Sequence, residues 1–268
     1  MHLLEDPYQM TTSTIQHNKA KKIILSIAVI LFWITAWHIA SIWIANETIL
    51  PSPLDVCKRL LVLGTEAEFW QITALSCVRI IVGFFIGCIL GTILGIVTRL
   101  FVAVKYLLSP ILTLIKATPV ASFIILLFIW LSGAVIPSFI GMLIVIPVVC
   151  QNVYEALASV DESLLEAAQV YQLTKVQKIQ FIYIPALRTY FLAAVKTSLG
   201  LSFKAGIAAE ILCTPKFSIG KEIYGAKIYL NTVDVFAWTA VVIILSLIFE
   251  LAFVKLLNKV TSRRGANI

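Results

Sequence analysis

Long apolar runs separated by short polar intervals dominate this sequence. The clearest runs cover residues 23–45, 72–97, 135–153, 187–213 and 233–257. A helix needs about 20 apolar residues to cross the hydrocarbon of a bilayer, and these runs reach that length. They do not alternate apolar and polar residues as the strands of a membrane barrel would. We therefore predict an all-α integral membrane protein with six transmembrane helices: these five runs and one shorter run between the second and third of them.

That shorter run, residues 120–131, is the third span in chain order and the least regular. It follows a lead-in segment at 106–116 and a predicted break at Thr118-Pro119. Because twelve residues are too few to cross a bilayer as a helix, we expect part of the lead-in to be embedded as well. The fourth span contains Pro147, where we expect a kink or a local opening.

Basic residues at both ends of the chain indicate the orientation. Lys19, Lys21 and Lys22 precede the first span, and Lys255, Lys259, Arg263 and Arg264 follow or end the last. Cytoplasmic flanks are enriched in Lys and Arg, so an even number of spans places both termini in the cytoplasm. We divide the chain into a cytoplasmic segment (1–22), a membrane domain (23–257) and a cytoplasmic tail (258–268). The intervals 46–70 and 214–232 are then loops on the outer side.

The longest polar interval, residues 161–185, lies between the fourth and fifth spans on the predicted cytoplasmic side. It predicts two short helices joined by a turn. Asp161 is suited to cap the first helix, and Thr174 with Gln177 forms a capping-box pattern at the start of the second. Pro185 is expected to close the segment, because proline disfavours helix at the residue before it. A charged pair of helices in water suggests a docking surface.

Composition excludes several other functions. The chain is 60% hydrophobic and 13% charged, with a formal net charge of +7. The basic residues flank the spans and form no stripe with interleaved aromatics, so we expect no nucleic-acid binding. The five cysteines lack ligand spacing and the three histidines are scattered, so we expect no metal site. The chain has no G-x-x-x-x-G-K-[ST] phosphate loop and no catalytic constellation, so we expect no enzyme and no cofactor bound by this chain.

The second span carries glycines at four-residue intervals. Gly83, Gly87, Gly91 and Gly95 therefore share one helix face, where a neighbouring helix can approach closely. Arg79 lies just before this ridge, and a charge inside a membrane must face protein or water. A structural ion pair is the favoured role for Arg79, and substrate contact is the alternative.

The fifth span holds Lys204 and Glu210, which are also candidate pathway or gating residues. Residues six apart do not face each other on one helix, so an ion pair between these two is not expected. For Lys204 two roles stay open: contact with a substrate, which would favour an anion, or a structural pair with Glu210, Glu250 or Asp234.

Glu166-Ala167-Ala168, together with Ile184-Pro185 at the right distance, resembles the EAA loop of bacterial ABC-importer permeases. Gln172 stands where the family has glycine, and Ile184 stands where it has leucine. Outside this loop, further positions resemble the nitrate/sulfonate/taurine-type branch of the binding-protein-dependent inner-membrane components. They are Leu50-Pro51-Ser52-Pro53, Ser76 with Arg79 and the glycine ridge, Pro147, Asn152, Leu199-Gly200 and Ala208-Ala209-Glu210.

The resemblance implies a type I ABC-importer permease in a bacterial cytoplasmic (inner) membrane. Its partners would be ATPase subunits that bind ATP, an extracytoplasmic substrate-binding protein and a second permease subunit, which we expect to be another copy of this chain. The residues implied in coupling to the ATPase are Glu166, Ala167, Ala168, Gln172, Thr174, Lys175 and Pro185, with a docking helix over about 172–180. Glycine at position 172 would supply a positive φ at little cost, so Gln172 is expected to alter the turn.

The alternative function is a secondary carrier or channel that needs no ATPase. The two are distinguished by whether an ATPase binds the 161–185 loop. The substrate is not determined by these residues: nitrate, sulfonates, taurine, bicarbonate and pyrimidines related to thiamine precursors all fit the branch, and Lys204 favours an anion.

Overall fold

The computed structural model describes the backbone of residues 7–265 and the side chains of residues 24–255. Within this part of the chain the regular structure is helical, as predicted. The helices are α1 (Pro7–Ile44), α2 (Pro53–Thr65), α3 (Ala67–Leu100), α4 (Val102–Ala117), α5 (Val120–Leu127), α6 (Ile136–Ala158), α7 (Glu162–Val170), α8 (Lys175–Lys178), the π-helix η1 (Ile179–Tyr183), α9 (Ile184–Cys213), α10 (Ile219–Ile228) and α11 (Thr232–Gly265).

Five of the described helical segments are long and apolar enough to cross a membrane. They are Ile24–Ile44, Ala67–Leu100, Ile136–Ala158, Lys175–Cys213 and Thr232–Lys255. The pair α4 and α5 also qualifies, but it bends by 102° at the break between its helices. That break is the predicted one at Thr118-Pro119. The described residues therefore contain five candidate spans, or six if the bent pair counts as one span.

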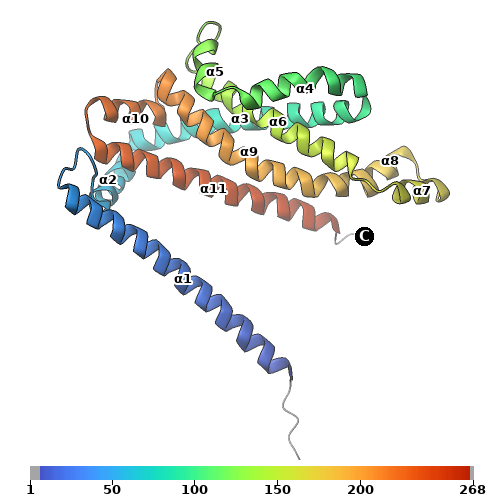
Figure 1. The fold of residues 1–268 in the computed structure, drawn as a ribbon, viewed down its shortest axis with the longest axis horizontal. Coiled ribbons are helices and arrows are strands. Elements are labelled where there is room, and N and C mark those ends of the chain that lie inside the picture. Colours follow the sequence, from blue (N-terminus) through green and yellow to red (C-terminus); the bar gives the residue numbers. More distant parts are fainter. Residues whose placement is uncertain (1–6, 266–268) are drawn as a thin grey trace, which may run out of the picture.

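The core of the bundle is formed where α3, α6 and α9 pack together (Figure 1). The four glycines of α3 lie against α6. A Cβ on Gly87 would come 2.7 Å from Cβ of Val145, and a Cβ on Gly95 would come 2.7 Å from Cβ of Val153. At separations this short a side chain would force α3 and α6 to shift, so the glycines let the two backbones approach more closely than larger residues would permit. Pro147 lies within α6, which continues as a single helix on both sides of it.

Helix α1 extends away from the other helices and contacts them near its C-terminal end, where it meets α2 and where Trp37 stacks on Phe236 of α11 (Figure 1). Most side chains between Ile24 and Ile44 are exposed, including Trp33 and Trp43. This helix must therefore be covered by lipid or by another protein, because a long apolar helix without cover is not stable in water.

Two intervals predicted as loops contain helices, and this corrects the sequence interpretation. In the first, Pro53 does not break structure; it begins α2, where its missing N–H costs nothing. Ser52 caps that helix by accepting a hydrogen bond from the amide of Asp55 at 3.2 Å. In the second, Ser218 caps α10 through the amide of Lys221 at 3.1 Å. Serine immediately before each helix was the signal for both starts.

Pro185 does not end the segment that precedes it, which is a second correction. The chain is helical without interruption from Lys175 through the π-helix Ile179–Tyr183 into α9. Ile184 has helical φ and ψ angles of −63° and −44°, and its amide bonds to the carbonyl of Ile179. The wider π turn accommodates the proline ring without breaking the helix. The part of the polar segment from Lys175 onward and the fifth span consequently form one continuous helix.

Candidate functional sites at the two ends of the bundle

The first candidate site is the α7–α8 pair, which projects from one end of the bundle (Figure 1). As predicted, Asp161 caps α7, and its carboxylate accepts a hydrogen bond from the amide of Ser163 at 2.9 Å. This bond holds the pKa of Asp161 below its ordinary value. Thr174 and Gln177 form the complete capping box of α8. Local side chains therefore fix both helix starts.

The turn between these helices is held by backbone bonds and does not need glycine. Gln172 has φ of +52°, in the left-handed region that glycine would adopt. The amide of Gln172 bonds to the carbonyl of Gln169, and the amide of Leu173 bonds to the carbonyl of Ala168, both at 2.9 Å. These two bonds form a Schellman motif, which is the usual end of a helix with a left-handed residue. Gln172 thus adopts the left-handed conformation that glycine would adopt, and the change expected in the turn is not seen.

The side chains of this pair are mostly open to solvent. Ala168 is buried at 2% exposure, whereas Glu166, Ala167, Gln172, Thr174, Lys175 and Pro185 are exposed. Glu166 makes no ion pair within the described residues. Val170 and Tyr171 are each 80% exposed and Val176 is 70% exposed. These three apolar side chains were not singled out from the sequence, although large apolar residues at the tip of a polar interval are a signal for a docking surface.

A buried polar network forms the second candidate site, near the opposite end of α9. Glu210 is fully buried and accepts hydrogen bonds from the hydroxyl of Ser76 at 2.8 Å and the amide of Gly220 at 3.2 Å. Arg79 lies 3.3 Å from the same carboxylate. Arg79 also donates to the carbonyls of Lys216 and Phe217, at 2.9 Å and 3.0 Å. The network joins α3, α9 and the start of α10.

Lys204 lies on an exposed face of α9 and takes no part in this network. None of the three carboxylates considered as partners pairs with it. Glu210 is bound to Arg79, Asp234 is bound to Arg59, and Lys204 has no ion pair to Glu250 or to any other described residue. Lys204 therefore has no partner for a structural ion pair within residues 24–255.

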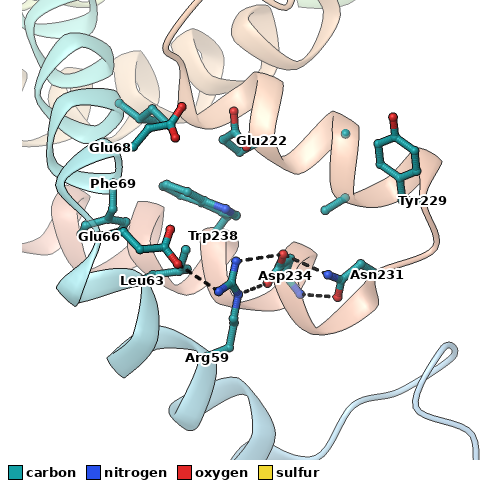
Figure 2. A pocket seen from close by; sticks show the side chains of 13 residues that line it. Arg59, Leu63, Glu66, Glu68, Phe69, Glu222, Tyr229, Asn231, Asp234 and Trp238 are labelled. Carbon is teal, nitrogen blue, oxygen red and sulfur yellow. Dashed lines mark hydrogen bonds and ion pairs between the residues drawn. The ribbon is translucent and has the colours of Figure 1, made fainter.

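A pocket of about 260 Å³ lies at the same end as the Glu210 network, between α2, α3, α10 and α11 (Figure 2). The Arg59 guanidinium contacts both oxygens of Asp234 and lies 3.3 Å from Glu66. Asn231 donates to Asp234 at 2.9 Å. Asp234, with Asn231 bound to it, is therefore joined to α2 through Arg59. The pocket was not predicted, because its residues come from distant parts of the sequence.

Comparison with known proteins supports one family. The model of the binding-protein-dependent transport system inner membrane component matches residues 83–264, which is more than half of the chain. The taurine transport system permease protein TauC of Escherichia coli is 25% identical over 253 residues, covering 92% of each chain. The putative aliphatic sulfonates transport permease protein SsuC of Escherichia coli is 28% identical over 205 residues, 74% of this chain and 76% of its own.

The bicarbonate transport system permease protein CmpB of Synechococcus elongatus is 26% identical over 221 residues, which is 78% of each chain. These relatives agree with the apolar helices and with the branch indicated by the sequence motifs. The chain belongs to the family of binding-protein-dependent transport system inner membrane components and is a multi-pass protein of the inner membrane.

Proposed function

We propose that this chain is the permease subunit of an ATP-binding-cassette importer and that it receives the work of ATP hydrolysis through residues 161–185. The main support is the form of that segment. It is a pair of capped helices at one end of the bundle that exposes Val170, Tyr171 and Val176. Exposed apolar side chains rimmed by charged residues are typical of a protein-protein contact.

The continuity of the helix from α8 into α9 gives this contact a mechanical consequence. A displacement of α8 by a partner is carried along η1 and α9, since no loop intervenes between Lys175 and Cys213. Shifts of whole helices and rigid-body rotations are among the ways in which proteins switch between two states. Closure of ATPase subunits around ATP would therefore tilt α9 and change the access of the pathway between the two sides.

The rest of the assembly follows from the same proposal. Two ATPase subunits bind the α7–α8 pairs on the cytoplasmic side, and both termini lie on that side. A second copy of this chain completes the pathway, since a symmetric pair is the commonest form of such assemblies. An extracytoplasmic binding protein delivers the substrate to the opposite end. The chain itself binds no cofactor, and ATP is held by the partner.

Lys204 is the pathway residue best supported by the structure. It is exposed in the single chain, lies within a span and has no ion-pair partner among the described residues. A charge at this depth costs about 2.5–3.5 kcal/mol unless it faces water or a counter-charge. An anionic substrate would supply that counter-charge, and the relatives named for taurine, sulfonates and bicarbonate act on solutes with an anionic group.

The decisive experiment is isolation of the chain from membranes with an affinity tag, followed by identification of proteins that remain bound. We expect an ATPase to be retained by the wild type and lost from Glu166→Lys and Val176→Asp. Glu162→Lys is the matched control, because Glu162 is an exposed carboxylate on the same helix outside the motif. Absence of any ATPase from the wild-type preparation, with uptake that survives ATP depletion, would instead indicate a secondary carrier.

A further inference from the structure

The pocket in Figure 2 lies at the end of the bundle opposite to α7 and α8. Its walls come from four helices: Arg59 and Leu63 on α2, Phe69 and Ile72 on α3, Glu222 on α10, and Trp238 on α11. On the proposed function this end faces the extracytoplasmic side, where a binding protein arrives. Its charged lining excludes contact with lipid hydrocarbon, so the pocket opens to water or to another protein.

The residues that line the pocket include four carboxylates and one basic side chain, so its lining has an excess of negative charge. Asp234 and Glu66 share the guanidinium of Arg59. Glu68 and Glu222 also line the pocket, and neither carboxylate forms a hydrogen bond or ion pair with a described residue. Burial raises the pKa of Glu222; the positive charge of Lys221 lowers it, and the charges of Glu68 and Asp234 raise it. Two nearby carboxylates whose side chains make no ion pair favour the arrival of a cation.

Trp238 provides an independent indication of a ligand. Its side chain is 4% exposed and packs on Phe69 with ring centroids 5.3 Å apart. The indole N–H donates to no atom of the described residues, and Figure 2 shows the indole directed into the pocket. Because this N–H opens into the pocket, it can donate to a group that enters there. The pocket therefore presents the unpaired carboxylates of Glu68 and Glu222 and one indole N–H donor to the same space.

A lysine or arginine on a protein loop supplies a cation for these carboxylates, and a backbone carbonyl of the same loop can accept from the indole N–H. The volume of about 260 Å³ suits one such side chain and lies at the lower end of the size of small-molecule sites, roughly 300 Å³. Tyr229 is 84% exposed and also lines the pocket, where its ring can stack on a guanidinium.

We propose that this pocket is a docking site for a lysine or arginine of the extracytoplasmic binding protein. The inference rests on the proposed function, since that function supplies the partner and places this end outside. Charge complementarity would increase the rate of docking, and the fit of the basic side chain would fix the register of the binding protein on the permease. Glu68 and Glu222 are the carboxylates that receive it.

The test uses the permease–ATPase complex in lipid nanodiscs and the purified binding protein of the same transport system. We expect the Kd for the binding protein to rise at least about tenfold in the double variant Glu68→Gln/Glu222→Gln. Glu47→Gln is the control, because Glu47 is an exposed carboxylate at the same end, outside the pocket, and it should leave the Kd unchanged. The co-purified ATPase reports separately whether each variant assembles.

A second measurement does not depend on a variant. A carbodiimide joins carboxylates to lysine amines in contact, so treatment of the docked wild-type complex should link Glu68 or Glu222 to a lysine of the binding protein. If the partner residue is arginine, this link is absent and the change in Kd alone supports the site. An unchanged Kd in the double variant would refute docking here, even where the ATPase is retained and the proposed function stands. Stabilisation of wild type but not the double variant by spermidine, with an unchanged Kd, would instead assign the pocket to a small cation.

Discussion

Arg79 of α3 and Glu210 of α9 form an ion pair of 3.3 Å at the end of the bundle that also carries the pocket. The Glu210 side chain is fully buried, and the Arg79 side chain is 17% exposed. Through its other bonds Arg79 holds the carbonyls of Lys216 and Phe217, in a segment where Thr214 and Phe217 both have positive φ. Arg79 therefore links α3 to α9 and to the strained segment that leads into α10.

Removal of the arginine should destabilise the fold. Arg79→Met leaves Glu210 with its bonds to Ser76 and Gly220 but without a counter-charge, and breaking a buried pair in this way costs about 3–5 kcal/mol. We expect a lower midpoint of thermal unfolding for the purified protein in nanodiscs. The double variant Arg79→Met/Glu210→Gln removes the orphaned charge and should recover part of the loss. Equal midpoints for wild type and Arg79→Met would show that the pair contributes nothing.

A methyl group on the glycine ridge should also destabilise the bundle. In Gly87→Ala the new Cβ would lie 2.7 Å from Cβ of Val145 and 2.9 Å from the carbonyl oxygen of Met142. Helices α3 and α6 would have to separate, at a cost of about 1–3 kcal/mol. Gly200→Ala is the matched control, because a Cβ there meets no atom within 4 Å. Thermal unfolding of both variants measures the difference, and similar midpoints would contradict the close packing.

Glycine at position 172 should strengthen the turn between α7 and α8. A residue with a side chain costs about 1–2 kcal/mol in the left-handed region, which glycine avoids. Gln172→Gly should therefore slow hydrogen exchange at the amide of Leu173, which closes the turn on Ala168. Gln169→Gly should do the opposite, because it places glycine inside α7, where it costs about 1 kcal/mol. Faster exchange in Gln172→Gly would show that the glutamine side chain itself supports the turn.

Much of the fold could be predicted because the apolar runs and the helix caps are local signals. The span starting at residue 72 and the capping box at Thr174 depend on residues close in sequence. Helices α2 and α10 were missed since their mixed composition resembles a loop, and their serine caps are weak signals alone. The helix continues through Pro185 because a π turn precedes it. That turn depends on the geometry of the whole helix, so the proline alone does not predict it.

The polar sites were less predictable for a different reason. Arg59 and Asp234 stand far apart along the chain, as do Arg79 and Glu210, and only the packing of the helices brings each pair together. Residue type indicated that Arg79 and Glu210 needed partners, because charges in a membrane are rarely left alone. It could not indicate which partners they would find.

The orientation can be checked with a native cysteine. Cys57 on α2 is exposed, whereas Cys77, Cys88 and Cys150 are buried. A maleimide that cannot cross the membrane should label Cys57 when it is added from the extracytoplasmic side of intact spheroplasts. Glu162→Cys, at the start of α7, should be labelled only after the membrane is made permeable. Labelling of position 162 in intact spheroplasts would invert the proposed topology.

Loss of the lysine in the fifth span should stop transport without releasing the ATPase. Lys204 has no ion pair among the described residues, so Lys204→Ala leaves no buried carboxylate without its partner and should preserve assembly. Uptake of the substrate should fall at least about a hundredfold if the lysine meets an anion at a depth where charges are costly, while Lys204→Arg should retain a measurable part. Lys216→Ala is the control, because its exposed side chain lies outside the span. Unchanged uptake in Lys204→Ala would refute a pathway role, and uptake lost together with the ATPase would assign the lysine to assembly.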